Sequence, residues 1–267
     1  MNGLFAMIEP IASDPEPVLS WLAMLVLALV AFATAVFSAI VGMGGGIVLL
    51  AVLLFFLDPL VVIPLHGAIQ LVSNGSRAVA QRRHLQWSLI WRYSILLLPF
   101  GVVALALVSS VPEDAITIVI GCFVLLATWR PQWLLVGARP EAINRNRRFI
   151  LLGGVVGFLN ILVGAVGPFI APFFLNMDLT RQAIVGTKAA CQGVGHLVKI
   201  IIFGLAGFAF AAFLPLLALL IPMVLLGTWV GTRLLERVNE RVFVALFKTV
   251  LTVVACWLIV STWFLAG

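Results

Sequence analysis

The sequence contains few charged residues and no long hydrophilic segment. Of its 267 residues, 10% are Asp, Glu, Lys or Arg, whereas 63% are hydrophobic. A water-soluble domain usually carries about 25% charged residues. The mean hydropathy of +1.22 agrees with this deficit. An aqueous fold is therefore excluded, and the longest polar stretch, about 130–148, predicts a connecting loop rather than a soluble domain.

Cysteine and catalytic motifs are also scarce. Cys122, Cys191 and Cys256 all lie within apolar segments, without the spacing of disulfides or metal ligands. The sequence has no HExxH, GxSxG or Walker lysine motif and no carboxylate pair inside an apolar segment. We therefore predict no metal, no cofactor and no enzymatic activity. The formal charge of +6 comes from basic residues scattered through short loops, so we expect no nucleic-acid partner.

Long apolar runs are what the sequence does have. They recur from residue 18 to the C-terminus, and each is long enough to cross about 30 Å of hydrocarbon as a helix. The runs are too uniformly apolar for barrel strands, in which polarity alternates. The sequence thus predicts an all-α, multi-pass integral membrane protein in a lipid bilayer.

Basic loops predict how the helices are oriented, because Lys and Arg concentrate on the cytoplasmic side. Segments 77–84, 139–148 and 233–241 are basic and are predicted to be cytoplasmic. The N-terminal tail and segments 109–114 and 204–207 lack Lys and Arg and are predicted to face outward. The predicted crossing helices are 60–81, 88–109, 114–131, 181–203, 208–231 and 242–265.

Two further apolar stretches, 18–57 and 149–177, must each begin and end on one side of the membrane. The first is predicted to start and end outside, and the second inside. Each is therefore a hairpin, formed either by two full crossings or by a re-entrant pair. Glycine-rich sequences at 42–46 and 164–168 mark the bends. The short stretch after Pro168 favours re-entrant half-helices in the second hairpin.

The two halves of the chain correspond when the sequence is shifted by 122 residues. Gly42 then falls on Gly164, and Gly45 on Gly167. The stripe His66, Gln70, Asn74 and Arg77 falls on Lys188, Gln192, His196 and Lys199, and both stripes occupy one face of a helix. We predict two inverted repeats, each a glycine-broken helical hairpin plus three transmembrane helices. The predicted regions are an outward-facing tail (1–17), the first repeat (18–131), a basic cytoplasmic loop (132–148) and the second repeat (149–267).

The polar stripes lie in spans that contain no Asp or Glu well inside them. Buried cations without matching carboxylates suggest that an anion completes the charge balance, at a midplane site such as inverted-repeat transporters have. Simpler interpretations stay open. Arg77 and Lys199 can extend to lipid headgroups, and the amides can serve as interhelical hydrogen-bonding groups. The histidines His66 and His196 can have that structural role or carry protons.

Residues 42–46 (Gly-Met-Gly-Gly-Gly) and 181–190, with Gly186, Thr187 and Lys188, resemble the TauE/SafE sulfite exporter family. The resemblance extends from about residue 21 to 264. It implies a permease of the bacterial inner membrane for sulfite, sulfonates or related organic anions. It also implies functional roles for Gly44, Gly45 and Gly46 and for the Gly-Thr-Lys stretch. The chain departs from the family in lacking a proline soon after the first glycine run.

We therefore predict a secondary transporter for a small anion, with alternating access between two halves. A membrane scaffold whose polar stripes only join helices is the alternative, an intramembrane enzyme is a more distant one, and a homodimer is allowed. The predicted proton carriers are His66 and His196. The predicted substrate-binding residues are Lys188, Gln192, Thr187, Gly186, His66, Gln70, Asn74, Gly44, Gly45, Gly46, Gly164 and Gly167.

The predicted hairpins can be tested by mapping topology with reporter fusions. A reporter active only outside the cytoplasm is expected to be active when fused after Leu57 and inactive when fused after Met177. Cytoplasmic reporters at the same positions should give the opposite pattern and serve as the control. An inactive reporter at Leu57 would contradict the same-side return of the first hairpin.

Overall fold

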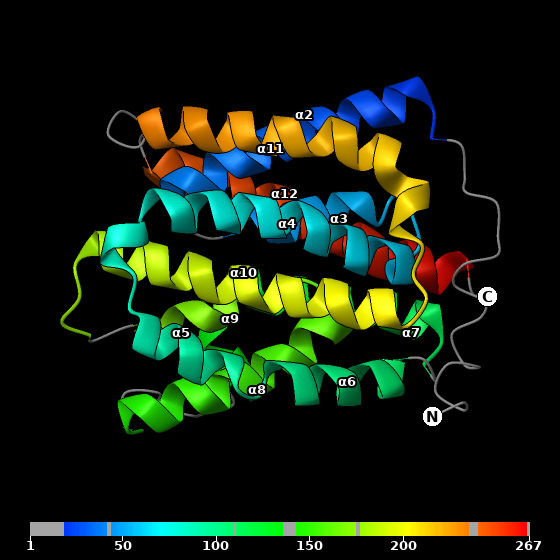
Figure 1. Ribbon diagram of the computed structural model, residues 1–267. Helices are drawn as coiled ribbons and strands as arrows, with labels where there is room; N and C mark the ends of the chain where they lie inside the picture. The colour runs from blue at the N-terminus through cyan, green and yellow to red at the C-terminus, as the bar shows by residue number, and fades with distance from the viewer. Residues whose placement is uncertain are drawn as a thin grey trace.

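The computed structural model describes residues 19–41, 44–108, 111–135, 143–174, 177–234 and 240–265. These residues form a bundle of helices, and no strand occurs within the described ranges. Figure 1 shows the long helices lying side by side in one layered bundle. The predicted all-α membrane fold is confirmed.

Long helices, shorter helices and 3-10 helices make up most of the described ranges. In chain order the elements are α2 (Trp21–Val41), α3 (Gly45–Leu53), α4 (Pro59–Ala80), η2 (Arg82–His84), α5 (Trp87–Ser94), α6 (Leu97–Val108), α7 (Glu113–Trp129), η3 (Pro131–Leu135), α8 (Arg145–Leu162), α9 (Gly167–Ile170), η5 (Ala171–Phe174), α10 (Arg181–Leu205), η6 (Phe210–Phe213), α11 (Leu214–Leu234) and α12 (Glu240–Leu265).

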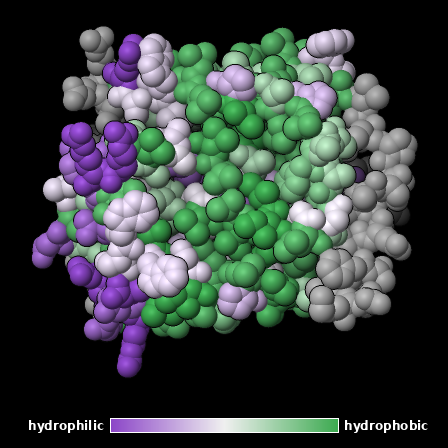
Figure 2. All heavy atoms as spheres, in the orientation of Figure 1, coloured by the Kyte–Doolittle hydropathy of each residue, from purple (hydrophilic) through white to green (hydrophobic). Residues whose placement is uncertain are grey.

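The surface of the bundle is apolar where lipid would cover it. Figure 2 shows a broad hydrophobic band, with hydrophilic residues gathered at the end that carries η2 and the start of α8. Large side chains such as Val103, Leu205 and Trp229 are more than half exposed on this surface. Within the described ranges, four segments are long and apolar enough to cross a membrane: Trp21–Ile40, Trp87–Val108, Gln182–Leu205 and Phe210–Leu234. The apolar exterior is therefore suited to contact with the hydrocarbon of a lipid bilayer.

Each hairpin consists of a long first arm and a short return arm. α2 has 21 residues and α8 has 18, whereas α3 has nine and α9 has four. At 1.5 Å per residue α3 is about 14 Å long, less than half of the ~30 Å hydrocarbon thickness. The two hairpins thus have unequal arms, and whether either hairpin crosses the membrane fully stays a prediction.

Helix pairing follows the 122-residue correspondence. The most extensive contacts join α2 to α11, α6 to α8, α4 to α10, and α7 to α12. The shift carries α2 onto α8 and α6 onto α11, so the α2–α11 pair corresponds to the α8–α6 pair. It carries α4 onto α10 and α7 onto α12, so the two members of each remaining pair correspond to each other. Figure 1 shows α4 and α10 side by side and running in opposite directions. This pairing agrees with two oppositely oriented halves, and the inverted repeat stays a prediction.

Two predicted crossing helices correspond to apolar spans, Trp87–Val108 and Phe210–Leu234, but each has an irregularity that was not predicted from the sequence. The helix predicted at 88–109 is interrupted at Ile95 and Leu96, between α5 and α6. Pro99 has no N–H for the carbonyl of Ile95, and its ring crowds that carbonyl, which favours the interruption at this point. The helix predicted at 208–231 begins later, at Leu214, after the 3-10 turn of η6.

The predicted loop 132–148 also contains helical residues at both ends. η3 occupies Pro131–Leu135, and α8 begins at Arg145 after Asn144, whose side chain accepts a hydrogen bond from the N–H of Asn146. Arg145 and Arg147 are exposed, whereas Arg148 is buried against the bundle. The predicted tail, 1–17, lies outside the described residues.

Glycine allows α8 to pack closely on α5 and α6. A Cβ atom at Gly153 would overlap the backbone carbonyl oxygen of Tyr93, and one at Gly157 would overlap that of Leu97. Backbone atoms cannot rotate out of the way as a side-chain end can. These two positions therefore determine how near α8 lies to the interrupted helix.

Gly153→Ala is expected to lower the thermal unfolding temperature in detergent, because overpacking costs about 1–3 kcal/mol. Gly75→Ala is the matched control, since a Cβ there meets no atom within 4 Å. That variant should be neutral or slightly stabilising, because Ala favours helix over Gly by about 1 kcal/mol. Unfolding is followed by tryptophan fluorescence, and equal melting temperatures for the two variants would contradict this packing.

Candidate functional site

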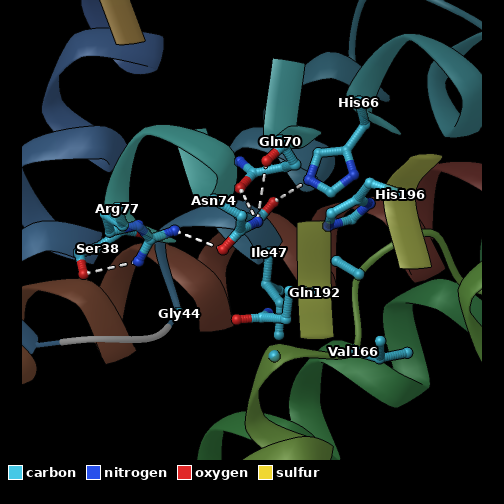
Figure 3. A pocket seen from close by; sticks show the side chains of 13 residues that line it. Ser38, Gly44, Ile47, His66, Gln70, Asn74, Arg77, Val166, Gln192 and His196 are labelled. Atoms are coloured by element: carbon cyan, nitrogen blue, oxygen red, sulfur yellow. Dashed lines mark hydrogen bonds between the residues drawn. The ribbon is translucent and has the colours of Figure 1, made fainter. Parts of the chain in front are cut away.

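A polar cavity lies between α4, α10 and the two hairpins (Figure 3). Its volume is about 330 Å³ when the open mouth is included. Both long polar stripes and both glycine bends contribute to its wall. The lining residues are Ser38, Gly44, Gly46, Ile47, His66, Gln70, Asn74, Arg77, Ala165, Val166, Gly167, Gln192 and His196.

The cavity lies near the middle of the two central helices. Gln70 is close to the midpoint of α4, and Gln192 is close to the midpoint of α10. A helix of this length spans roughly the hydrocarbon thickness, so the cavity lies near the bilayer midplane. The return arms of the hairpins reach it because their first residues lie against the two amides. A Cβ atom at Gly46 would be 3.2 Å from Gln70 Cδ, and one at Gly167 would be 3.2 Å from Gln192 Nε2.

The cation in the cavity wall is Arg77, which is 7% exposed. Its Nε donates to the carbonyl oxygen of Ser73 at 3.2 Å, and its Nη1 donates to that of Ser38 at 3.1 Å. Its Nη2 donates to Asn74 Oδ1 at 2.7 Å. Protein acceptors among the described residues thus take three of the five N–H groups of the guanidinium. Two N–H groups are left for a ligand.

Asn74 is oriented by the same network. Its Nδ2 donates to the carbonyl oxygen of Gln70 at 3.0 Å and lies 3.4 Å from Gln70 Oε1. With its Oδ1 accepting from Arg77, the side chain is fixed along one face of α4. Figure 3 shows this chain of polar groups running from Arg77 through Asn74 to Gln70.

Two histidines complete the polar wall, one from each central helix. His66 and His196 contact each other edge to face, with ring centroids 5.7 Å apart and an interplanar angle of 79°. His66 Nε2 lies 2.8 Å from the carbonyl oxygen of Gly46. Both rings are buried, at 1% and 4% exposure. The α4 and α10 stripes therefore meet at this pair.

Lys199 is fully buried and is bonded to the bend of the second hairpin. Its Nζ donates to the carbonyl oxygen of Gly164 at 2.7 Å. Gly164 has φ +85°, a left-handed conformation that glycine adopts without strain. The lysine crosses α4 at Gly67, where a Cβ atom would be 3.0 Å from Lys199 Cε. Neither Lys199 nor Arg77 extends to the membrane surface, so the headgroup interpretation does not hold for them.

Several predicted site residues lie beside the cavity instead of in its wall. Lys188 is 5% exposed and close enough to Arg77 for their charges to interact, but it does not line the cavity. Gly186 packs against Gln81, and Thr187 Oγ1 accepts a hydrogen bond from the N–H of Gln86 at 3.0 Å.

Only some of the other predicted glycines line the cavity. Gly44 and Gly46 line the cavity, as does Gly167, whereas Gly45 and Gly164 do not. A Cβ at Gly45 would overlap the carbonyl oxygen of Thr34, so this glycine allows α3 to approach α2. Gly44 has φ +96° and precedes the first turn of α3. Of the predicted residues, the structure brings together His66, Gln70, Asn74, Gly44, Gly46, Gly167, Gln192 and His196.

The predicted binding set omitted Arg77 and Ser38, which both line the cavity. A sequence signal for Ser38 existed, because the 122-residue shift places it on Asn160, another buried polar residue in an apolar run. Asn160 does not line the cavity; its Nδ2 donates to the carbonyl oxygen of Gly195 at 3.1 Å. Ile47, Ala165 and Val166 carried no polar signal and were found only through the fold.

The charges inside the bundle have one sign in the part of the chain that the structure describes. The buried charged residues are Arg77, Arg148, Lys188 and Lys199. The acidic residues whose side chains the structure describes are Asp58, Glu113, Asp114 and Asp178, and all four are exposed, between helices or at the start of α7. The interior is therefore suited to an anionic ligand.

A bundle of apolar helices around a polar midplane cavity, with interrupted segments at its wall, is the architecture of membrane transport proteins. The model of the family described as "Sulfite exporter TauE/SafE" matches residues 27–258 of the chain. The chain belongs to this family, which consists of transporters and not of enzymes. No curated protein and no solved structure matches the chain.

Proposed function

We propose that the protein is a secondary transporter of small oxyanions, with sulfite or an organosulfonate as substrate, in the inner membrane of a bacterium. The observation that carries the proposal is the midplane cavity, in which Arg77 lies together with the side-chain amides of Gln70, Asn74 and Gln192. The described residues place no carboxylate in its wall. Family membership supports anion export as the general activity.

The donors around the cavity suit an oxyanion. The two remaining N–H groups of Arg77 can bind one or two oxygens, and charge-assisted hydrogen bonds of this kind are the stronger ones. Gln70 and Gln192 offer amide N–H groups from opposite helices. The N-terminus of α3 lies at the wall through Gly44 and Gly46, and the first N–H groups of a helix have no partner within it. Each of these groups stabilises negative charge.

Lys188 keeps a place in the proposal outside the cavity wall. It is buried beside Arg77 and lies on α10 one turn closer to the helix start than Gln192. Its charge adds to the positive potential at that end of the cavity. We propose that it attracts the anion toward Arg77 without contacting it at the midplane. Gly186 and Thr187 would then position the start of α10.

The size of the cavity implies that transport requires movement. The enclosed part of the cavity accommodates on the order of one or two water molecules, fewer atoms than sulfite contains. The short return arms α3 and α9 are the natural moving parts, because each is attached through a positive-φ glycine or a bend rather than through continuous helix. Alternating access would open the cavity to one side at a time.

Flux into proteoliposomes tests the proposal directly. Vesicles containing the purified protein are expected to take up radiolabelled sulfite faster than protein-free vesicles. Methanesulfonate, phosphate and nitrate are compared under the same gradient. Folded protein that carries none of these anions would favour the alternative, a scaffold in which the polar stripes only join helices.

Asn74→Asp separates anion binding from folding. The carboxylate has the shape of the amide and can accept from Arg77 Nη2 as a charged partner, which offsets the loss of the Nδ2 hydrogen bond to the Gln70 carbonyl oxygen. The unfolding temperature of the variant is measured alongside flux to show that the protein is folded. The carboxylate also cancels the charge of Arg77, and an ion pair at 4 Å is worth about 4 kcal/mol at an effective dielectric constant of 20. We therefore expect flux to fall at least about tenfold, which corresponds to only 1.4 kcal/mol.

Asn146→Asp is the matched control, because Asn146 is exposed at the start of α8. It makes the same chemical change far from the cavity and should leave flux unchanged. Normal flux in the Asn74→Asp variant would show that the anion does not bind beside Arg77.

A further inference from the structure

The pair formed by His66 and His196 has hydrogen-bonding capacity that the fold leaves unused. His66 Nε2 lies 2.8 Å from a backbone carbonyl oxygen, which can only accept, so Nε2 carries the hydrogen. In the neutral ring, Nδ1 of His66 is then a bare lone pair. That atom and Nδ1 of His196 are both buried and have no hydrogen-bond partner. Buried polar atoms of this kind are unusual and require an explanation.

The two rings lie where an anion in the cavity would act on them. Both line the cavity, and Figure 3 shows them adjacent at its wall, near Gln70. The Gly46 carbonyl that holds His66 belongs to the first turn of α3, the return arm of the first hairpin. The pair therefore connects both central helices with a hairpin.

Cations are the charged groups nearest to the pair. Lys199 of α10 acts on both rings, and Arg77 of α4 acts on His196. The other titratable side chains on α10 with described positions are Lys188 and Cys191. From the packed neighbours, α3, α6, α9 and η5 contribute none, and α5 contributes Tyr93, which faces Cys191, and Arg92.

The other neighbours of α4 and α10 carry their charges at helix ends. α7 has two exposed carboxylates in its first turn, and an exposed thiol at Cys122. α8 has three arginines in its first turn, α11 has one arginine in its last turn, and η2 has two arginines and His84. Among the described residues, no carboxylate is buried near the pair.

We propose that the His66–His196 pair takes up one proton when an oxyanion binds in the cavity, so that the anion and a proton cross the membrane together. This proposal rests on the anion transport proposed above. The proton adds to the lone pair of an imidazole nitrogen, and no other bond in the protein is broken. It returns to water from the same nitrogen when the anion leaves.

The coupling follows from the charges around the pair. A proton on either ring adds positive charge beside Lys199, which is unfavourable while the cavity holds only water. A bound oxyanion offsets that charge and supplies an acceptor for the new N–H. Because linkage is reciprocal, the proton must strengthen anion binding by the same factor as the anion strengthens proton binding. Two imidazolium rings with centroids 5.7 Å apart would repel each other, so the pair takes up one proton and not two.

Calorimetry of sulfite binding in two buffers with different ionisation enthalpies measures the protons taken up per anion. The double variant His66→Gln/His196→Gln keeps hydrogen-bonding groups but cannot titrate. Wild-type protein is expected to take up about one proton per anion more than the double variant. Any proton that sulfite itself brings is counted in both proteins and cancels in the difference.

Two further variants keep the test decisive. His84→Gln is the matched control, because His84 is exposed in η2, and its proton uptake should equal that of the wild type. His196→Gln alone breaks no hydrogen bond among the described residues. It is used if the double variant fails to fold, and it should also reduce proton uptake.

The outcomes distinguish this inference from the function on which it rests. Equal proton uptake in wild-type protein and in the histidine variants overturns proton coupling, while sulfite flux into vesicles leaves anion transport standing. Absence of both binding and flux overturns both proposals. Flux that falls as external pH rises in the wild type, and that changes little with pH in the variants, supports the coupling.

Discussion

The arrangement of this protein depends on how cations are held inside a lipid-embedded bundle. A charged side chain at membrane depth costs at least about 2.5 kcal/mol unless it faces a cavity or a partner. Two of the three stripe cations, Arg77 and Lys199, are stabilised by carbonyl oxygens at the ends of hairpin arms. Lys199 donates to Gly164 and Arg77 donates to Ser38. The broken backbone that forms the hairpins therefore also supplies the acceptors that make the cations tolerable.

This constraint explains why the bends and the polar stripes occur together in each half. A helix end exposes carbonyl groups that have no partner within the helix. In lipid these groups need internal donors, and a lysine or arginine on the adjacent long helix provides them. The cavity forms where the two such junctions meet, between α4 and α10.

The two halves share a scaffold but differ in chemistry at equivalent positions. The 122-residue shift pairs His66 with Lys188 and Asn74 with His196. Each of the two helices thus contributes one histidine near the centre of the cavity. The two histidines do not occupy corresponding positions in the two halves. Lys188 instead lies toward the start of α10, beside Arg77. Such divergence would give one end of the cavity a permanent charge and leave its centre with groups that can gain a proton.

Most of the fold could be predicted from the sequence because lipid makes hydropathy and charge decisive. The crossing helices, the two bends and the register of the stripes followed from these signals. The interruption at Ile95 did not, although Pro99 was visible, because a proline in an apolar run can also be tolerated in a continuous helix. The unequal hairpin arms were missed for a related reason. Hydropathy measures how long an apolar run is, but not where a bend divides it.

The candidate site was harder to predict, and the reason is geometric. Periodicity places Lys188, Gln192, His196 and Lys199 on one face of α10, yet only the middle two line the cavity. The face is about 17 Å long over these residues, whereas the cavity occupies its centre. Lys199 is drawn to the hairpin carbonyl, and Lys188 lies beyond the opposite edge. Sequence spacing therefore identifies which face is polar, but the acceptors on neighbouring elements decide which side chains face a ligand. Arg77 lines the cavity, and acceptors in the described residues take only three of its five N–H groups. It is therefore a better candidate for direct anion contact than Lys188, which does not line the cavity.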